Sequence, residues 1–232
     1  MAIKQLTEDL YVIPGLVNMY VLRSGDGLVV IDTGFPGSTS KILGGVRALG
    51  KKPGDVRHIL LTHAHPDHVG SAAALRRETG ATVWAHPLDA PIIKAGSGFR
   101  PVTASPGLLN KLVTRFLLGR IKAVEPTRVD HFLEEGDRLP FLPDLTVVHV
   151  PGHCAGQVAF VWSRHGGLLF PADTCVNLRG PKLPPAVENL DVARASLTRL
   201  AALDVEAVCY MHGRPVMHGG GKLLRRASLA GW

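Results

Sequence analysis

The sequence predicts a single α+β domain, and three observations lead to this fold class. The 232 residues fit one domain of upper-middling size. Hydrophobic residues make up 46% of the chain, which is enough to bury a sizeable core. Strand-like apolar runs precede the helices in each half of the chain, so a simple alternation of strands and helices fits badly.

The expected elements follow the hydrophobic pattern along the chain. In the first half, apolar runs predict strands near 10–14, 18–23, 27–31, 57–61 and 81–85, and helices are expected near 38–49, 71–79 and 87–94. In the second half, strands are expected near 129–133, 145–150, 157–162, 167–170 and 206–210, followed or interrupted by a helix near 191–202 and a short terminal helix. The domain is expected to occupy residues 1–232.

Residues 95–127 stand out as an insert between these halves. The segment begins with glycines and prolines and then becomes helical. Its apolar residues share one helical face (Leu108, Leu109, Leu112, Val113, Phe116 and Leu117), and its polar residues fall mainly on the other (Lys111, Thr114, Arg115 and Lys122). A compact core needs no such excursion, so we expect a lid over the site. A helix packed on the domain and a contact between two copies in a homodimer are the alternatives.

The stretch Thr62-His63-Ala64-His65-Pro66-Asp67-His68 is the most informative motif of the chain. It follows an apolar run that is typical of a buried strand. Three imidazoles and a carboxylate are too dense for a structural loop, and they are the ligand types that Zn²⁺ prefers, with Fe and Mn as rivals. The motif therefore predicts a metal site at the end of a strand.

Three further ligand-type residues follow later apolar runs. His153 comes after Leu145–Val150, Asp173 after Leu169–Ala172, and His212 after the strand expected at 206–210. The carboxyl ends of strands are where folds of strands and helices assemble a site from separate segments. We expect all of these residues to meet the first motif.

The ordered set resembles the metal-binding pattern of the metallo-β-lactamase superfamily, in the branch that includes glyoxalase II and the lactonases. The resemblance runs from the region of Tyr20–Gly34 to His212. It implies an αβ/βα four-layer sandwich of two mixed β-sheets flanked by helices. Ala172, Met211 and Gln157 depart from the residues common in the family, which bears on the subfamily and removes no ligand.

The resemblance also implies a ligand assignment. Two divalent ions are expected, most simply Zn²⁺, because the protein ligands are too many for one ion. The implied ligands are His63, His65 and His153 for the first ion, Asp67, His68 and His212 for the second, and Asp173 as a bridge. Asp67 and Asp173 are the expected catalytic residues. Asp32 is expected to hold a ligand histidine in its tautomer, with capping of a turn as an equal alternative.

A site of this kind predicts a hydrolase that uses a hydroxide bridging the two ions on a small ester, thioester or lactone. Two ions, two aspartates and one hydroxide leave about one positive charge, which favours an anionic substrate or a developing oxyanion. Asp67 is expected to take or relay the proton. Three alternatives remain: an oxidoreductase similar to the mononuclear iron persulfide dioxygenases, a metal-dependent phosphodiesterase or nuclease, and a β-lactamase.

Net charge, hydropathy and cysteine content limit the expected partners and the expected location of the protein. The formal net charge is +7, but the basic residues are mostly scattered, so we expect a small-molecule substrate and no nucleic acid. No apolar run is long enough to span a bilayer, and the first residues do not resemble a secretory signal, which predicts a cytoplasmic protein. The cysteines at 154, 175 and 209 are too few and odd in number for a disulfide framework. We interpret them as small buried side chains, and a thiolate ligand at Cys154 or Cys175 is the alternative.

Overall fold

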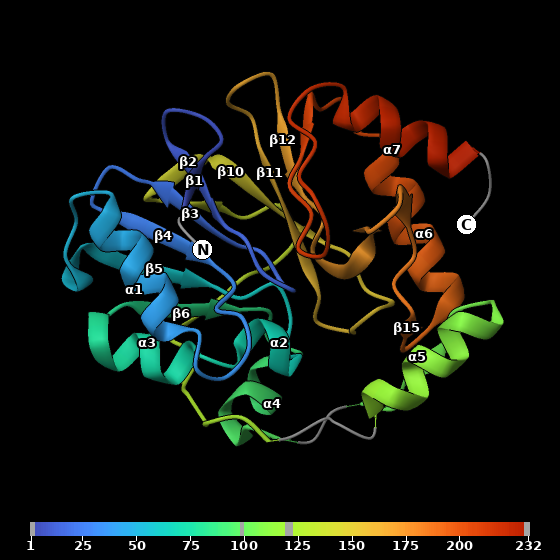
Figure 1. The fold of residues 1–232 in the computed structure, drawn as a ribbon, viewed down its shortest axis with the longest axis horizontal. Coiled ribbons are helices and arrows are strands. Elements are labelled where there is room, and N and C mark those ends of the chain that lie inside the picture. The colour runs from blue at the N-terminus through green and yellow to red at the C-terminus, as the bar shows by residue number, and fades with distance from the viewer. Residues whose placement is uncertain (1–2, 98–99, 119–122, 230–232) are drawn as a thin grey trace.

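Two β-sheets pack face to face between two layers of helices in the computed structural model, which describes residues 3–97, 100–118 and 123–229 (Figure 1). The larger sheet has the strand order β1-β2-β3-β4-β5-β6-β8, and the smaller has the order β16-β12-β11-β10-β9. This is the four-layer architecture that the resemblance implies.

The larger sheet is antiparallel at one side and parallel at the other. Its antiparallel strands are β1 (Lys4–Gln5), β2 (Leu10–Ile13), β3 (Met19–Arg23) and β4 (Leu28–Ile31), and its parallel additions are β5 (Val56–Leu60), β6 (Thr82–Ala85) and β8 (His131–Phe132). The helices of this half are α1 (Thr39–Ala48), η1 (Pro53–Asp55), α2 (Pro66–Val69), α3 (Ala72–Thr79) and α4 (Ala90–Ala95). Ile42 of α1 and Leu75 of α3 pack on the outer face, against residues such as Val30 and Ile59.

The smaller sheet supplies the second half of the sandwich. Its strands are β9 (Arg138–Leu139), β10 (Leu142–His149), β11 (Val158–Trp162), β12 (Leu168–Phe170) and β16 (Ala207–Val208), of which β12 and β16 pair in parallel. Its outer face is covered by α6 (Leu190–Ala201) and α7 (Gly220–Leu229), and the loops carry η2 (Ala172–Thr174), β13 (Val176–Asn177), β14 (Pro181–Lys182) and β15 (Ala186–Val187).

The core between the sheets follows from the two-residue period of the strands. In β4, Val29 and Ile31 face the smaller sheet, whereas Val30 faces the helices. Tyr20 and Phe170 meet across the interface with ring centroids 5.2 Å apart in an edge-to-face arrangement. Both faces of β2, β3 and β4 are therefore buried, which explains why these strands are apolar along almost their whole length, whereas the edge strands β1 and β8 are exposed.

The elements expected from the sequence are confirmed, with shifts at their ends. The strand expected from 145 begins at Leu142, and the strand expected from 206 to 210 is shorter. The two-residue strands β1, β9, β13, β14 and β15 and the one-turn helix α2 were not predicted, because segments this short carry no periodicity. Within the described residues, no helix combines the length and the apolar character needed to cross a bilayer.

The insert contains β7 (Thr103–Ala104), which pairs with β15, and the expected helix, α5 (Leu108–Leu118). The leucines in its first half face solvent: Leu108 is 74% exposed, Leu109 is 69% exposed and Leu112 is 58% exposed. Residues 98–99 and 119–122 and the side chain of Leu117 lie outside the described part of the structure, so the positions assigned to Leu117 and Lys122 are not described.

Candidate metal centre

The first motif lies where β5 leaves the sheet and α2 begins. His63 is buried just beyond the end of β5, and His65 is the extended residue before the helix, with φ −69° and ψ 146°. Pro66 opens α2, a position that suits its fixed φ and its missing N–H. The helical turn brings Asp67 and His68 to the centre beside His63, whose ring centroid lies 4.0 Å from that of His68, so one short segment supplies four of the expected ligands.

Three imidazole nitrogens meet in the first group. His65 Nδ1 lies 3.1 Å from His63 Nε2 and 2.9 Å from His153 Nε2. The ligand atoms of these three residues and Cys154 all lie within 4.8 Å of one another. Three neutral imidazoles at this separation form the nitrogen-rich set that suits Zn²⁺.

The second group contains Asp67, His68 and His212. Asp67 Oδ2 lies 3.7 Å from His68 Nε2 and 3.5 Å from His212 Nε2. Asp173 lies between the two groups: its Oδ1 is 3.6 Å from His68 Nε2, and its Oδ2 is 3.1 Å from His212 Nε2 and 3.7 Å from His153 Nε2. All seven residues expected from the sequence therefore converge, and Asp173 contacts members of both groups.

The outer nitrogens of the histidines are held by other parts of the protein. His68 Nδ1 donates to Asp32 Oδ2 at 2.8 Å, which is the role expected of Asp32. The other outer contacts are His63 Nδ1 to Thr62 Oγ1, His153 Nδ1 to the Ala186 carbonyl, His212 Nδ1 to the Leu16 carbonyl, and His65 Nε2 with Cys154 Sγ at 3.3 Å. An acceptor at the outer nitrogen fixes the proton there and leaves the inner nitrogen free to bind a cation.

Two buried polar atoms in the centre lack a hydrogen-bond partner among the described residues. They are His68 Nε2 and Asp173 Oδ1, which face each other. A buried polar atom without a partner is costly, and a cation between an imidazole nitrogen and a carboxylate oxygen satisfies both atoms. The donor set and these two atoms fit a metal centre.

The two groups of ligands differ in their electrostatics. Burial lowers the pKa of His63, His65 and His153, and that of His65 falls to about 3. Burial also opposes the charged form of His212, but Asp173 and Asp67 outweigh it and raise its pKa to about 10.

The remaining members of the second group show the same balance. Asp173 and Asp67, with Asp32, raise the pKa of His68 despite its burial. Conversely, His68 and His212 lower the pKa of both Asp67 and Asp173, although burial alone would raise it. Without metal, the first group is neutral and the second is a network of charges.

Asp89 is a positioning residue that sequence reasoning missed. Its fully buried carboxylate accepts hydrogen bonds from the backbone amides of Ala64, at 2.9 Å, and Gly156, at 3.1 Å. Arg100 Nη1 lies 2.7 Å from the same carboxylate. Asp89 thus joins the loop of His63 and His65 to the loop of His153. No spacing in the sequence singles it out.

Gln157, which departs from the family pattern, also has a structural role. Its Oε1 accepts a hydrogen bond from the Asp173 amide, and its Nε2 donates to Thr174 Oγ1 and the Val150 carbonyl. Ala172 has a φ of +51°, a left-handed conformation that explains why glycine is common at this position in the family. Gln157 thus holds the backbone of Asp173 and the side chain of Thr174.

The other candidates from the sequence lie outside the centre. His86 stacks on His149 with ring centroids 4.2 Å apart and accepts a hydrogen bond from the Leu88 amide, as expected for a structural residue. Cys175 is buried, with its thiol near the Val176 carbonyl. Cys154 is the one cysteine among the described residues whose sulfur reaches the ligands.

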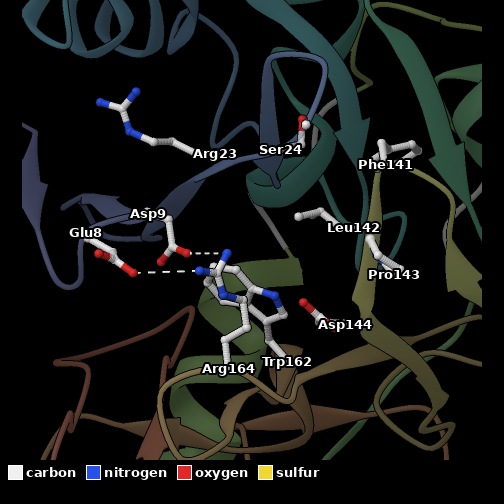
Figure 2. A pocket seen from close by; sticks show the side chains of 11 residues that line it. Glu8, Asp9, Arg23, Ser24, Phe141, Leu142, Pro143, Asp144, Trp162 and Arg164 are labelled. Atoms are coloured by element: carbon white, nitrogen blue, oxygen red, sulfur yellow. Dashed lines mark ion pairs between the residues drawn. The ribbon is translucent and has the colours of Figure 1, made fainter.

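A separate hollow of about 470 Å³ is lined by none of the seven ligands (Figure 2). Arg164 lies over the Trp162 ring and pairs with Asp9 at 2.7 Å and with Glu8 at 3.6 Å. His165 also approaches Asp9, at 2.7 Å. Glu8 and Asp9 are thus already paired, and the hollow lies apart from the metal centre.

Fold and site together define the class of protein: the chain belongs to the metallo-β-lactamase superfamily, whose family model matches residues 12–212. Among curated proteins, it is 24% identical over 220 residues to the probable metallo-hydrolase YflN of Bacillus subtilis, covering 87% of this chain and 82% of that protein. It is 32% identical over 157 residues to a hydroxyacylglutathione hydrolase of Pseudomonas aeruginosa. That match covers 66% of this chain and 45% of the relative, so the chain spans about half of that enzyme.

Solved structures agree on the fold. BJP-1, a subclass B3 metallo-β-lactamase of Bradyrhizobium japonicum, superposes with a TM-score of 0.72 at 26% identity, covering 97% of this chain and 89% of that one. MIM-1 of Novosphingobium pentaromativorans gives a TM-score of 0.74 at 21% identity, covering 99% and 87%. The family, the metallo-hydrolase relatives and the histidine cluster make this chain a metal-dependent hydrolase.

Proposed function

We propose that this chain is a dinuclear zinc hydrolase that acts on a small ester, thioester or lactone. The position of Asp173 carries the proposal. Its two carboxylate oxygens face histidines from both groups, His68 on one side and His153 and His212 on the other. A carboxylate in this position can serve two cations at once, whereas a mononuclear site would leave the second group of ligands without a role.

The two groups of residues would each hold one ion. His63, His65 and His153 supply three nitrogens to the first, and Asp67, His68 and His212 supply an oxygen and two nitrogens to the second. When bound, such ions supply a nucleophilic hydroxide at neutral pH and polarise a carbonyl oxygen.

The protein's own residues set where a substrate enters. The side chains of Asp67 and His212 are 25% and 21% exposed, whereas His68 is fully buried and Asp173 nearly so. The substrate therefore approaches from the side of Asp67 and His212. Asp67 is the carboxylate on this open side, so its side chain is placed to relay a proton to the leaving group.

The substrate class rests on chemistry and on relatives. Two divalent cations outweigh the charges of Asp67 and Asp173, which favours an anionic substrate or a negative transition state. The hydroxyacylglutathione hydrolases supply a precedent for an acyl substrate. The subclass B3 β-lactamases share the fold, and a β-lactam belongs among the substrates tested.

The experiment combines metal analysis with hydrolysis assays. Protein purified without added metal should contain about two ions per chain, hydrolyse a thioester or lactone, lose this activity to a chelator and regain it with Zn²⁺. The panel should include phosphodiesters and β-lactams. Asp173→Asn should abolish activity, whereas Asp144→Asn, on the exposed part of β10, should not. One iron per chain with oxygen uptake on a persulfide would overturn the proposal in favour of the oxidoreductase alternative.

A further inference from the structure

The insert helix α5 is turned with its apolar face outward. Leu108, Leu109, Leu112 and Phe116 are 74%, 69%, 58% and 55% exposed. These four residues, which we call the α5 face, lie within about 100° of arc at 100° per residue. The side of α5 that meets the protein carries Thr114, which is only 5% exposed. An ordinary surface helix has the reverse orientation, with its apolar side against the core.

Specific hydrogen bonds hold α5 in this orientation. Thr114 Oγ1 donates to the Pro185 carbonyl at 3.0 Å. At the start of the helix, the Ser105 side chain donates to the Pro184 carbonyl at 2.6 Å, and the Ser105 amide donates to the Pro185 carbonyl at 2.8 Å. Polar contacts thus anchor the helix from its inner side and leave Leu108, Leu109 and Leu112 in solvent.

Charge distinguishes the surfaces that could cover the α5 face. Residues 90–124 contain no Asp or Glu, and they carry six basic residues, Lys94, Arg100, Lys111, Arg115, Arg120 and Lys122. Lys111 and Arg115 are exposed and lie one turn apart along the edge of the leucine stripe. An apolar stripe bordered by cations is the pattern of helices that lie in a membrane interface, with the leucines in the acyl region and the cations at the headgroups.

We propose that the α5 face docks the protein on the surface of an anionic lipid bilayer. Self-association through the same face is disfavoured, because it would bring Lys111 and Arg115 of two copies together with no acid in residues 90–124 to pair with them. The net charge of +7 adds attraction to the same surface.

Docking there would place the metal centre beside the bilayer. Pro185, the acceptor of Thr114, precedes Ala186, whose carbonyl accepts the hydrogen bond of the ligand His153 at 2.8 Å. Figure 1 shows α5 beside β15, the strand that contains Ala186. The opposite side of α5, through Thr114, is therefore attached to the segment that orients one of the ligands.

Vesicle flotation of the full chain tests the proposal. The protein should float with vesicles of phosphatidylcholine and phosphatidylglycerol, less with phosphatidylcholine alone, and less as salt rises. Leu112→Glu should lower the partition coefficient about tenfold or more, because it places a charge in the apolar face that enters the bilayer on docking. Phe132→Glu on β8 is the matched control, since Phe132 is 55% exposed and lies outside the insert; it should float like wild type.

Two double variants, each lacking two positive charges, distinguish docking through the α5 face from general electrostatic attraction to the vesicle. Lys111→Gln with Arg115→Gln should weaken flotation about tenfold, whereas Lys51→Gln with Lys52→Gln, at two exposed positions outside the insert, should not. Equal losses in both charge variants, or unchanged flotation of Leu112→Glu, would overturn the proposal. So would a wild-type dimer that ignores vesicles and becomes monomeric in Leu112→Glu by sedimentation velocity. Unchanged thermal melting of the variants verifies that each is folded.

Discussion

Asp32 Oδ2 lies 2.8 Å from His68 Nδ1, and both side chains are fully buried. The same carboxylate accepts hydrogen bonds from the Thr62 amide and hydroxyl, at 2.9 and 2.8 Å. The Thr62 hydroxyl in turn lies 3.0 Å from His63 Nδ1. One aspartate thus orients a histidine in each group of ligands, directly for His68 and through Thr62 for His63.

Asp32→Asn should weaken metal binding about 10- to 100-fold, because one oxygen that accepts hydrogen bonds becomes an amide donor facing other donors. Competition with a chelating dye measures the loss. Asp26→Asn is the matched control, since Asp26 contacts His58 at 3.1 Å outside the centre. Equal affinity in wild type and Asp32→Asn would show that His68 needs no such anchor.

Asp89→Ala should destabilise the fold by about 3 kcal/mol or more, because it leaves two buried amides without an acceptor and removes the nearest carboxylate of Arg100. Urea unfolding measures the change. Glu125→Ala removes the partner of Arg77 at an exposed site and should leave the midpoint almost unchanged. A midpoint for Asp89→Ala equal to that of wild type contradicts the view that Asp89 joins the two ligand loops.

Gly152→Ala should destabilise the fold by about 2–4 kcal/mol, because the new Cβ meets backbone in a left-handed conformation. Gly152 has a φ of +124°, and a Cβ there would lie 2.3 Å from the Ala193 amide nitrogen. Gly50→Ala, at φ +71° with nothing within 4 Å, isolates the conformational cost. Thermal melting of the two variants should therefore differ, and His153, the next residue, should bind metal less well only in Gly152→Ala.

Removing metal should lower the melting temperature. An ion that binds only the folded state stabilises it by about 4 kcal/mol when its concentration is a thousand times Kd. The buried polar atoms of the centre also lose their partner when the ion leaves. Calorimetry with and without a chelator tests this, and adding Zn²⁺ back should restore the original melting temperature. Melting that ignores the chelator would contradict a structural contribution from the ions.

Acid should remove the second ion before the first. In the metal-free protein the pKa of His212 is about 10, so an ion at this position must displace a proton at neutral pH. The pKa of His65 is about 3, so the first group is already unprotonated. Affinity falls about tenfold per pH unit for each displaced proton.

Zinc titrations at pH 6 and pH 8 measure this difference. The ratio of zinc to protein should approach two at pH 8 and one at pH 6. The same raised pKa of His212 stabilises the metal-free fold fully below its unfolded value of about 6.5, and this stability is lost as pH rises toward 10. Equal pH dependence of the two binding steps would contradict the assignment.

Sequence by itself determined which residues meet at the centre. Its ligand-type side chains each follow a strand-like run, and their order matches the metal-binding pattern of the superfamily, so the sequence assigned His153, Asp173 and His212 to the site of His63 although they follow strands of the other sheet. It also located the main strands and helices, because burial on one or both faces leaves a periodic apolar pattern that is local in the chain.

Tertiary structure alone decided which residues hold the metal centre in place and which face of helix α5 is exposed to solvent. Asp89 and Gln157 act on backbone amides of distant segments, and a backbone amide leaves no residue type to recognise. Periodicity placed Leu108 and Leu112 on one face of a helix, but it does not say which face meets the protein. The contact between Thr114 and Pro185 decided that, because a long-range hydrogen bond orients the whole helix.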